Sequence, residues 1–119
     1  MAIPSYQGYL HRSRIGEAIS DGLRDEVKSA VAAQVTKPGS AAGRPVEFAP
    51  KTRFVKSIAV DYRAGTVFIN LDEMAIGHVD AIPPGSWISF TAVTKDGAIV
   101  EWKCDKKGVA SKLLPANCR

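Results

Sequence analysis

Apolar side chains recur at intervals of three and four residues along the first third of the chain. Between about Ser5 and Val35 they form a single stripe: Ile15, Ile19, Leu23, Val27, Ala30 and Val31. This spacing predicts an amphipathic helix, because such residues share one helical face. Ser5 is a candidate N-cap, and the sequence Lys37-Pro38-Gly39 is typical of a helix end. We therefore expect one long helix over residues 1–36.

The first turns of this expected helix carry a thinner apolar stripe. Tyr6, Tyr9 and Leu10 fall on one side, with few core positions around them. A helix that begins in this way is expected to project beyond the body of the domain. These three side chains would then need another surface to cover them. The alternative is that they pack within the domain.

A strand-like pattern replaces the helical one in the second half of the chain. Residues 37–53 are rich in Gly, Ala and Pro and predict a connecting loop. Four later segments are rich in β-branched and aromatic residues: Phe54–Tyr62, Thr66–Leu71, Trp87–Thr94 and Ala98–Cys104. The pair Asp96-Gly97 is a hairpin signal between the last two. The pattern predicts an α+β fold, with the helix packed on an antiparallel meander of about four strands over residues 54–104.

The length of the chain indicates how many domains to expect, and its charge indicates which partners are favoured. A chain of 119 residues is typical of one domain, so we expect a single domain over residues 1–119. The formal net charge of +4 favours acidic partners without requiring one. Near the C-terminus a single acid, Asp105, stands among five basic residues: Lys103, Lys106, Lys107, Lys112 and Arg119. This segment is therefore the candidate site for DNA or another anionic partner.

The two cysteines, Cys104 and Cys118, have neither CxxC spacing nor a histidine at a metal-ligand spacing. An even pair near a chain end is typical of a disulfide that closes a loop, and such bonds form in oxidising compartments. The alternative is two buried thiols in a reducing compartment. Neither a signal peptide nor an apolar run long enough to span a membrane occurs. Since a disulfide protein needs export, we expect that a natural N-terminal segment is absent from this chain.

The sequence holds few candidates for catalysis. His11 is expected on the helix and His78 in a loop, and neither has a cysteine or serine placed as a nucleophile partner. No glycine-rich phosphate loop occurs. The adjacent acids Asp72 and Glu73 are interpreted as solvated side chains. We therefore expect a protein that is not an enzyme and that uses no cofactor and no metal ion.

Motifs at both ends of the chain resemble those of type IV pilins. The segment AIPSYQGYLHRSRIGEA is similar to the family's junction between the hydrophobic and amphipathic halves of its N-terminal helix, through Ala2, Ile3, Pro4, Tyr6, Tyr9, Arg12, Glu17 and Ala18. The segments DGAIVEWKC and LLPANCR resemble the family's Trp-x-Cys strand and its closing Leu-Pro-x-x-Cys, through Asp96, Gly97, Trp102, Cys104, Leu114, Pro115 and Cys118. The chain departs from the family in lacking the short leader and the apolar first half of the helix.

This resemblance, which is to major pilins of the type IVa kind, implies the pilin fold with a disulfide-bounded loop over residues 104–118. It also implies a structural subunit of a type IV pilus, a surface filament used for adhesion, twitching motility and DNA uptake. Tyr6, Tyr9 and Leu10 would then pack on the helices of neighbouring subunits. The implied partners are other copies of the chain, the pilus assembly machinery of the inner membrane, and DNA or host surfaces. The filament would be extracellular with an inner-membrane pool before assembly, and the chain without its hydrophobic half would be soluble.

Two other functions stay open from the sequence. A minor pilin would bind DNA through the five basic residues of the C-terminal segment, because clustered cations contact phosphates. Against this, no aromatic residue lies among them to stack on single-stranded bases. A pseudopilin of a type II secretion system is the other alternative, although the C-terminal loop resembles that of pilins proper.

Trp102 and Trp87 are interpreted as core residues.

Overall fold

The computed structural model describes the backbone of residues 4–36, 45–62, 64–77 and 82–118. The side chains of residues 4–9, 35, 36 and 45 lie outside this description. The elements follow in the order α1 (Pro4–Gly22), α2 (Asp25–Thr36), β1 (Pro45–Phe48), β2 (Val55–Asp61), β3 (Thr66–Leu71), α3 (Glu73–Ile76), β4 (Trp87–Lys95), β5 (Ala98–Lys107), and the 3-10 turns η1 (Ser111–Leu113) and η2 (Ala116–Cys118).

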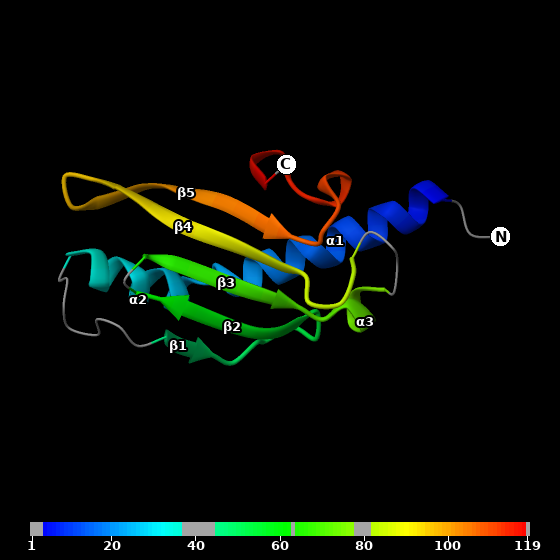
Figure 1. Cartoon of the computed structure of the whole chain (residues 1–119), viewed down its shortest axis with the longest axis horizontal. Coiled ribbons are helices and arrows are strands. Elements are labelled where there is room, and N and C mark those ends of the chain that lie inside the picture. The colour runs from blue at the N-terminus through cyan, green and yellow to red at the C-terminus, as the bar shows by residue number, and fades with distance from the viewer. Residues whose placement is uncertain (1–3, 37–44, 63, 78–81, 119) are drawn as a thin grey trace.

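A helical layer covers one face of a single sheet. The five strands pair antiparallel, and their spatial order is the chain order, β1-β2-β3-β4-β5. In Figure 1 the strands pass in front of α1. The sheet face turned toward the viewer is therefore not covered by α1 or α2. We call this the outer face. The first turns of α1 extend past the end of the sheet (Figure 1).

The prediction of one long helix packed on about four strands was wrong. Two shorter helices replace it, because α1 ends at Gly22 and α2 begins at Asp25. The sheet has five strands. The apolar stripe continues through the break, from Ile19 in α1 to Val27 in α2. Periodicity alone therefore carried no sign that the helix is interrupted.

Polar contacts of Arg24 stabilise the helix break. Its guanidinium donates hydrogen bonds to Asp21 at 2.8 Å and to Glu26 at 2.7 Å. Its carbonyl accepts from the backbone N–H of Val27 at 3.0 Å and of Lys28 at 3.1 Å, so the first bonds of α2 start at Arg24. Burial lowers the pKa of Arg24, but the hydrogen bonds and charges of Glu26 and Asp21 outweigh it and raise the pKa above its ordinary value. Arg24 is therefore cationic at any physiological pH.

The fifth strand lies in the segment that the composition assigned to a loop. β1 pairs with β2 in a register that places Phe48 opposite Ile58. Four residues are too few to show an alternating pattern, and a proline within them argues against a strand unless it lies at a sheet edge. β1 is such an edge strand. Phe48 contacts the core, so this short strand is held by packing as well as by pairing.

The core lies between the helices and the sheet. Alternate residues of the inner strands are buried against α1 and α2, because successive side chains of a strand point to opposite faces. The fully buried residues of this layer include Ile58, Val60, Val67, Ile69 and Ile88 from the strands and Ile15, Ala18, Val27 and Val31 from the helices. The side chains of Phe68 and Trp87 do not belong to this cluster.

Gly22, the last residue of α1, lies against Ile69 of β3. A Cβ atom built on Gly22 would lie 2.3 Å from the Cδ1 and Cγ1 atoms of Ile69. Ile69 is fully buried and has little room to move away. The absence of a side chain at Gly22 is therefore what lets the end of α1 rest on the sheet.

We expect Gly22→Ala to lower the free energy of unfolding by about 1–3 kcal/mol, because the added methyl group overpacks the core. Gly16→Ala is the matched control on the same helix, since a Cβ there meets no atom within 4 Å. The control should keep or raise stability by up to about 1 kcal/mol through its higher helix propensity. Urea unfolding monitored by circular dichroism measures both. Equal stability of the two variants would contradict the close approach.

Candidate functional site

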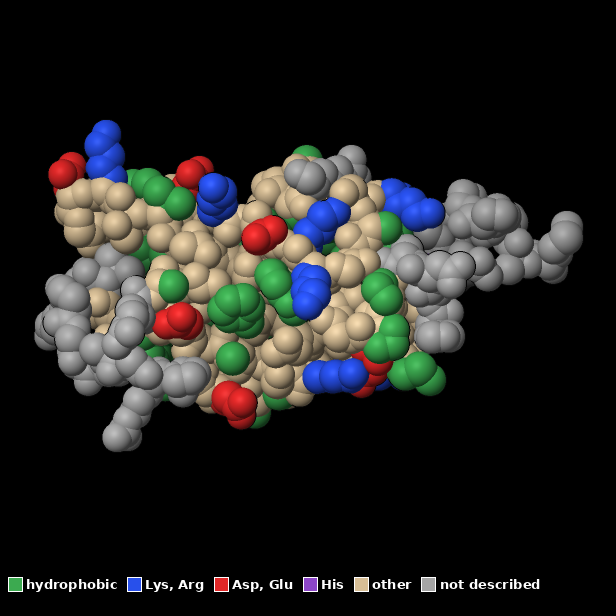
Figure 2. Space-filling view, viewed as in Figure 1, with side chains coloured by type: hydrophobic (Ala, Val, Ile, Leu, Met, Phe, Trp, Pro, Cys, Tyr) green, Lys and Arg blue, Asp and Glu red, His purple; other side chains and the backbone are tan. Residues whose placement is uncertain are grey.

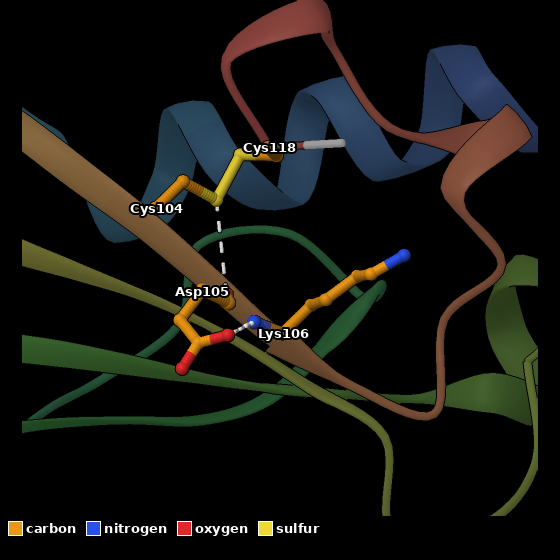
Figure 3. Close-up of a disulfide and its surroundings, with 4 residues drawn as sticks. All are labelled: Cys104, Asp105, Lys106 and Cys118. Carbon is orange, nitrogen blue, oxygen red and sulfur yellow. Dashed lines mark hydrogen bonds between the residues drawn. A yellow bond between two sulfur atoms is a disulfide. The ribbon is translucent and has the colours of Figure 1, made fainter.

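A disulfide ties the C-terminal segment to β5. Cys104 and Cys118 are bonded, with their Cα atoms 5.0 Å apart, so the predicted pairing is confirmed. Cys104 lies opposite the buried Phe90 of β4, and Cys118 is itself buried. Figure 3 shows the side chains of Cys104 and Asp105 leaving β5 on opposite sides. The disulfide therefore lies on the helix side of the sheet.

Apolar packing holds the same segment in place. Val109, Leu113 and Leu114 are buried between η1 and the rest of the core. The backbone N–H of Leu113 donates to Ala110 at 3.0 Å, and that of Cys118 donates to Pro115 at 2.9 Å, so two tight turns shape the segment. The disulfide thus closes a segment that contributes to the core rather than a loop that only crosses the surface.

The basic residues of the C-terminal segment do not form one patch. Lys103 and Lys107 are on the outer face, because their partners on β4 are Thr91 and Trp87. Lys106 lies opposite the buried Ile88, on the other face of the strand. Its Nζ atom donates a hydrogen bond to Ser111 of η1.

The remaining two basic residues of the segment are Lys112 and Arg119. Lys112 is exposed on η1. Arg119 lies outside the described residues. The anion site predicted at the C-terminus is therefore divided between two faces of the molecule.

The expected assembly residues lie on the part of α1 that passes beyond the sheet. Tyr6 and Tyr9 are within α1, but their side chains lie outside the described residues. Leu10 is half-buried. The order of these residues along α1 places them on its first turns, which Figure 1 shows extending away from the sheet.

Two side chains mark the point at which α1 leaves the body. Arg14 donates to the carbonyl of Ile76 in α3 at 2.6 Å, and its guanidinium lies 5.8 Å from the ring centre of Phe54. The imidazole of His11 lies against Gly77, where a Cβ atom would come within 2.6 Å of its Nε2. These contacts anchor the helix one turn after Leu10.

The candidates for catalysis have structural contacts instead. Asp72 caps α3 by accepting a hydrogen bond from the backbone N–H of Ala75 at 3.1 Å. Glu73 is buried and forms an ion pair with Lys56 at 3.1 Å, so the interpretation of these acids as solvated was wrong. His78 lies outside the described residues. Across the part of the chain that the structure describes, no group of three His, Cys, Asp or Glu residues could hold a metal ion.

The outer face carries an aromatic pair that the sequence did not reveal. Phe68 and Trp87 meet there with ring centres 5.5 Å apart in an edge-to-face arrangement. The interpretation of Trp87 as a core residue was therefore wrong, whereas Trp102 packs against the core. A groove of about 600 Å³ runs beside the pair and is lined also by Lys103 and Asp105. The only sequence signal was the alternation along each strand, which does not show which face is buried.

Comparisons with known proteins point to a filament protein. The fimbrial protein EcpC of Eikenella corrodens is 26% identical over 121 residues, an alignment that covers all of this chain and 77% of that protein. No protein-family model matches the chain. No solved structure matches it. The similarity supports a fimbrial, pilin-like protein. Among the helices that the structure describes, none is both long and apolar enough to cross a membrane.

We expect loss of the disulfide to cost about 3 kcal/mol of unfolding free energy, since the bond closes a loop between residues 14 positions apart. The Cys104→Ser/Cys118→Ser variant should therefore unfold at a lower urea concentration than the unaltered chain.

A reducing agent supplies the control for this prediction. It should shift the unfolding curve of the unaltered chain and leave that of the double variant unchanged. An unaltered chain that unfolds identically with and without reductant would contradict a stabilising disulfide.

Proposed function

We propose that this chain is the structural subunit of a type IV pilus, of the type IVa major kind, and that it assembles through the first turns of α1. The observation that carries the proposal is the geometry of α1, which is anchored to the body at His11 and Arg14 and extends beyond it. Similarity to a fimbrial protein over the whole chain supports the same role.

The mechanism of assembly follows from this geometry. Leu10 is half-buried within its own domain, so part of its apolar surface is left for a contact with another molecule. In a filament, the helices of neighbouring copies supply that contact. Tyr6, Tyr9 and Leu10 are the residues that we assign to these contacts. A contact of this head-to-tail kind builds a helical filament when its rotation does not close into a ring.

The proposed role is not enzymatic and needs no cofactor. It is supported by the structural use of His11, Asp72 and Glu73, each of which is held by a neighbouring element. We further propose that the filament is extracellular and serves adhesion, twitching motility and DNA uptake. The inner-membrane assembly machinery would be the partner before export.

Neither alternative gains a specific observation. A DNA site built from all five C-terminal basic residues needs them on one surface, but Lys106 lies on the opposite face of β5 from Lys103 and Lys107.

The direct test is to shear surface filaments from cells that make this protein and to identify their main component by mass spectrometry. We expect this protein to be the bulk component. If another pilin dominates and this chain is scarce, the structural role is wrong.

A charge placed on the projecting helix should block assembly. We expect Leu10→Asp in the full-length precursor to reduce the filament yield roughly tenfold or more, because an unpaired charge would be buried between subunits. Lys28→Asp on the exposed face of α2 is the control and should leave the yield unchanged. The unfolding midpoints of both variant domains should stay near that of the unaltered domain. Normal filament yield from Leu10→Asp cells would contradict assembly through this part of α1.

A further inference from the structure

Three rows of side chains cross β3, β4 and β5 on the outer face. The pairing registers place one residue of each strand in each row. The rows are Thr66, Thr91 and Lys103; Phe68, Ser89 and Asp105; and Asn70, Trp87 and Lys107. Figure 2 views this face and shows apolar, basic and acidic side chains close together over the middle of the sheet.

The two aromatic rings lie on a diagonal of this array. Phe68 and Trp87 are both half-buried, with an angle of 81° between their ring planes. Because the helices pack on the opposite face, neither ring is needed to fill the core. Aromatic rings left at a surface in this way provide flat apolar area, on which the faces of unpaired bases stack irrespective of sequence.

Three of the four neutral polar side chains of the array already have a hydrogen-bond partner. The hydroxyl groups of Thr66 and Thr91 are 2.8 Å apart, and the amide of Asn70 donates to Ser57 at 2.9 Å. Specific recognition of a ligand needs polar groups that are free to pair with it. This surface is therefore suited to a ligand held by stacking and charge rather than by a hydrogen-bond code.

The cations of the array are available to an anion. Lys103 and Lys107 are exposed, and among the described residues the side chain of neither has a hydrogen bond or an ion pair. Asp105 lies between them, with one carboxylate oxygen accepting from the backbone N–H of Lys106 at 2.8 Å. Four residues of strand separate the two lysines by about 13 Å. One small anion cannot bridge that span, whereas successive phosphates of a nucleic-acid strand can.

We propose that the outer face of the sheet binds single-stranded nucleic acid without sequence preference. Phe68 and Trp87 stack on bases, and Lys103 and Lys107 contact the phosphates on the β5 side of the groove. Duplex nucleic acid is a poorer ligand, because its bases are already stacked and paired. The proposal does not depend on assembly of the chain into a filament.

Binding is measured by the fluorescence anisotropy of a labelled oligothymidylate of about 15 nucleotides. A duplex of the same length is the comparison. We expect tighter binding of the single strand, with a slope of about −1.4 in log affinity against log salt if two phosphates are contacted. Equal or tighter binding of the duplex would overturn the proposal.

Two matched pairs of lysines separate this surface from the C-terminal segment. Lys103→Ala/Lys107→Ala and Lys106→Ala/Lys112→Ala remove the same charge from different faces. We expect the first pair to weaken binding about fivefold or more and the second to leave it within about twofold. Equal effects would indicate attraction by net charge alone, and the reverse order would assign binding to the C-terminal segment. Either result overturns the proposal.

The aromatic pair is tested by fluorescence and by a conservative substitution. In a Trp102→Phe background Trp87 is the single tryptophan, and the oligonucleotide should quench its emission. Phe68→Leu keeps an apolar side chain but removes the ring, so we expect about fivefold weaker binding. Urea unfolding checks that the variant remains folded. Absence of quenching, or unchanged binding by Phe68→Leu, would overturn the proposal.

Removing the negative charge of Asp105, which lies between the two lysines, should strengthen binding. A loss of folding could not produce that result. Asp105→Asn should tighten binding about threefold, because it removes repulsion of the phosphates beside the groove. Sedimentation of the chain alone tests whether the face serves a second copy instead. A dimer that is lost in Phe68→Leu would assign the rings to self-association and would overturn the proposal.

Discussion

A buried carboxylate joins the helical layer to the sheet. Asp21 is only 8% exposed, yet it is a charged group at the end of α1. Arg24 donates to one of its oxygens at 2.8 Å, and the backbone N–H groups of Lys51 and Thr52 donate to the other at 2.9 and 3.2 Å. Burial of a carboxylate is unfavourable unless it is paired and hydrogen-bonded. This one arrangement therefore constrains both the helix break and the path of the chain into β2.

The rest of the architecture follows from that junction. One residue beyond Asp21, Gly22 lets α1 rest on Ile69 of β3. The carbonyl of Arg24 accepts the first hydrogen bonds of α2, which continues the apolar stripe over the sheet. Phe54 is buried next to the segment that Asp21 binds. Together these contacts place both helices on one face of the sheet. The outer face is left free of them as a consequence.

The two proposed functions fall on separate regions of the molecule. The first turns of α1 pass beyond the anchoring contacts of Arg14 and His11, which supports a role in contact between subunits. The outer face gathers Phe68 and Trp87 beside two unpaired lysines. The disulfide stabilises the far edge, since it fixes the C-terminal segment against β5 on the helix side. Assembly and binding would thus use separate surfaces of one domain.

The local features of the fold could be read from the residues alone. Ile15, Val27 and Val31 are buried as the helical spacing predicted, and Thr66–Leu71 is the strand β3. The turn at Asp96-Gly97 could be predicted because it depends on two adjacent residue types. The disulfide could be predicted because the chain has only two cysteines. Such signals need no knowledge of what packs on them.

The features that depend on contacts between distant residues could be seen only in the tertiary structure. The helix break relies on donors from Lys51 and Thr52, some thirty residues away, and β1 is held by its pairing with β2. Strand alternation alone places Lys106 and Lys103 on opposite faces of β5. It does not show which of the two faces is buried. The registers of β3, β4 and β5 were needed to bring Phe68 and Trp87 beside the lysines. Long-range pairing sets these positions, and no short stretch of the sequence encodes it.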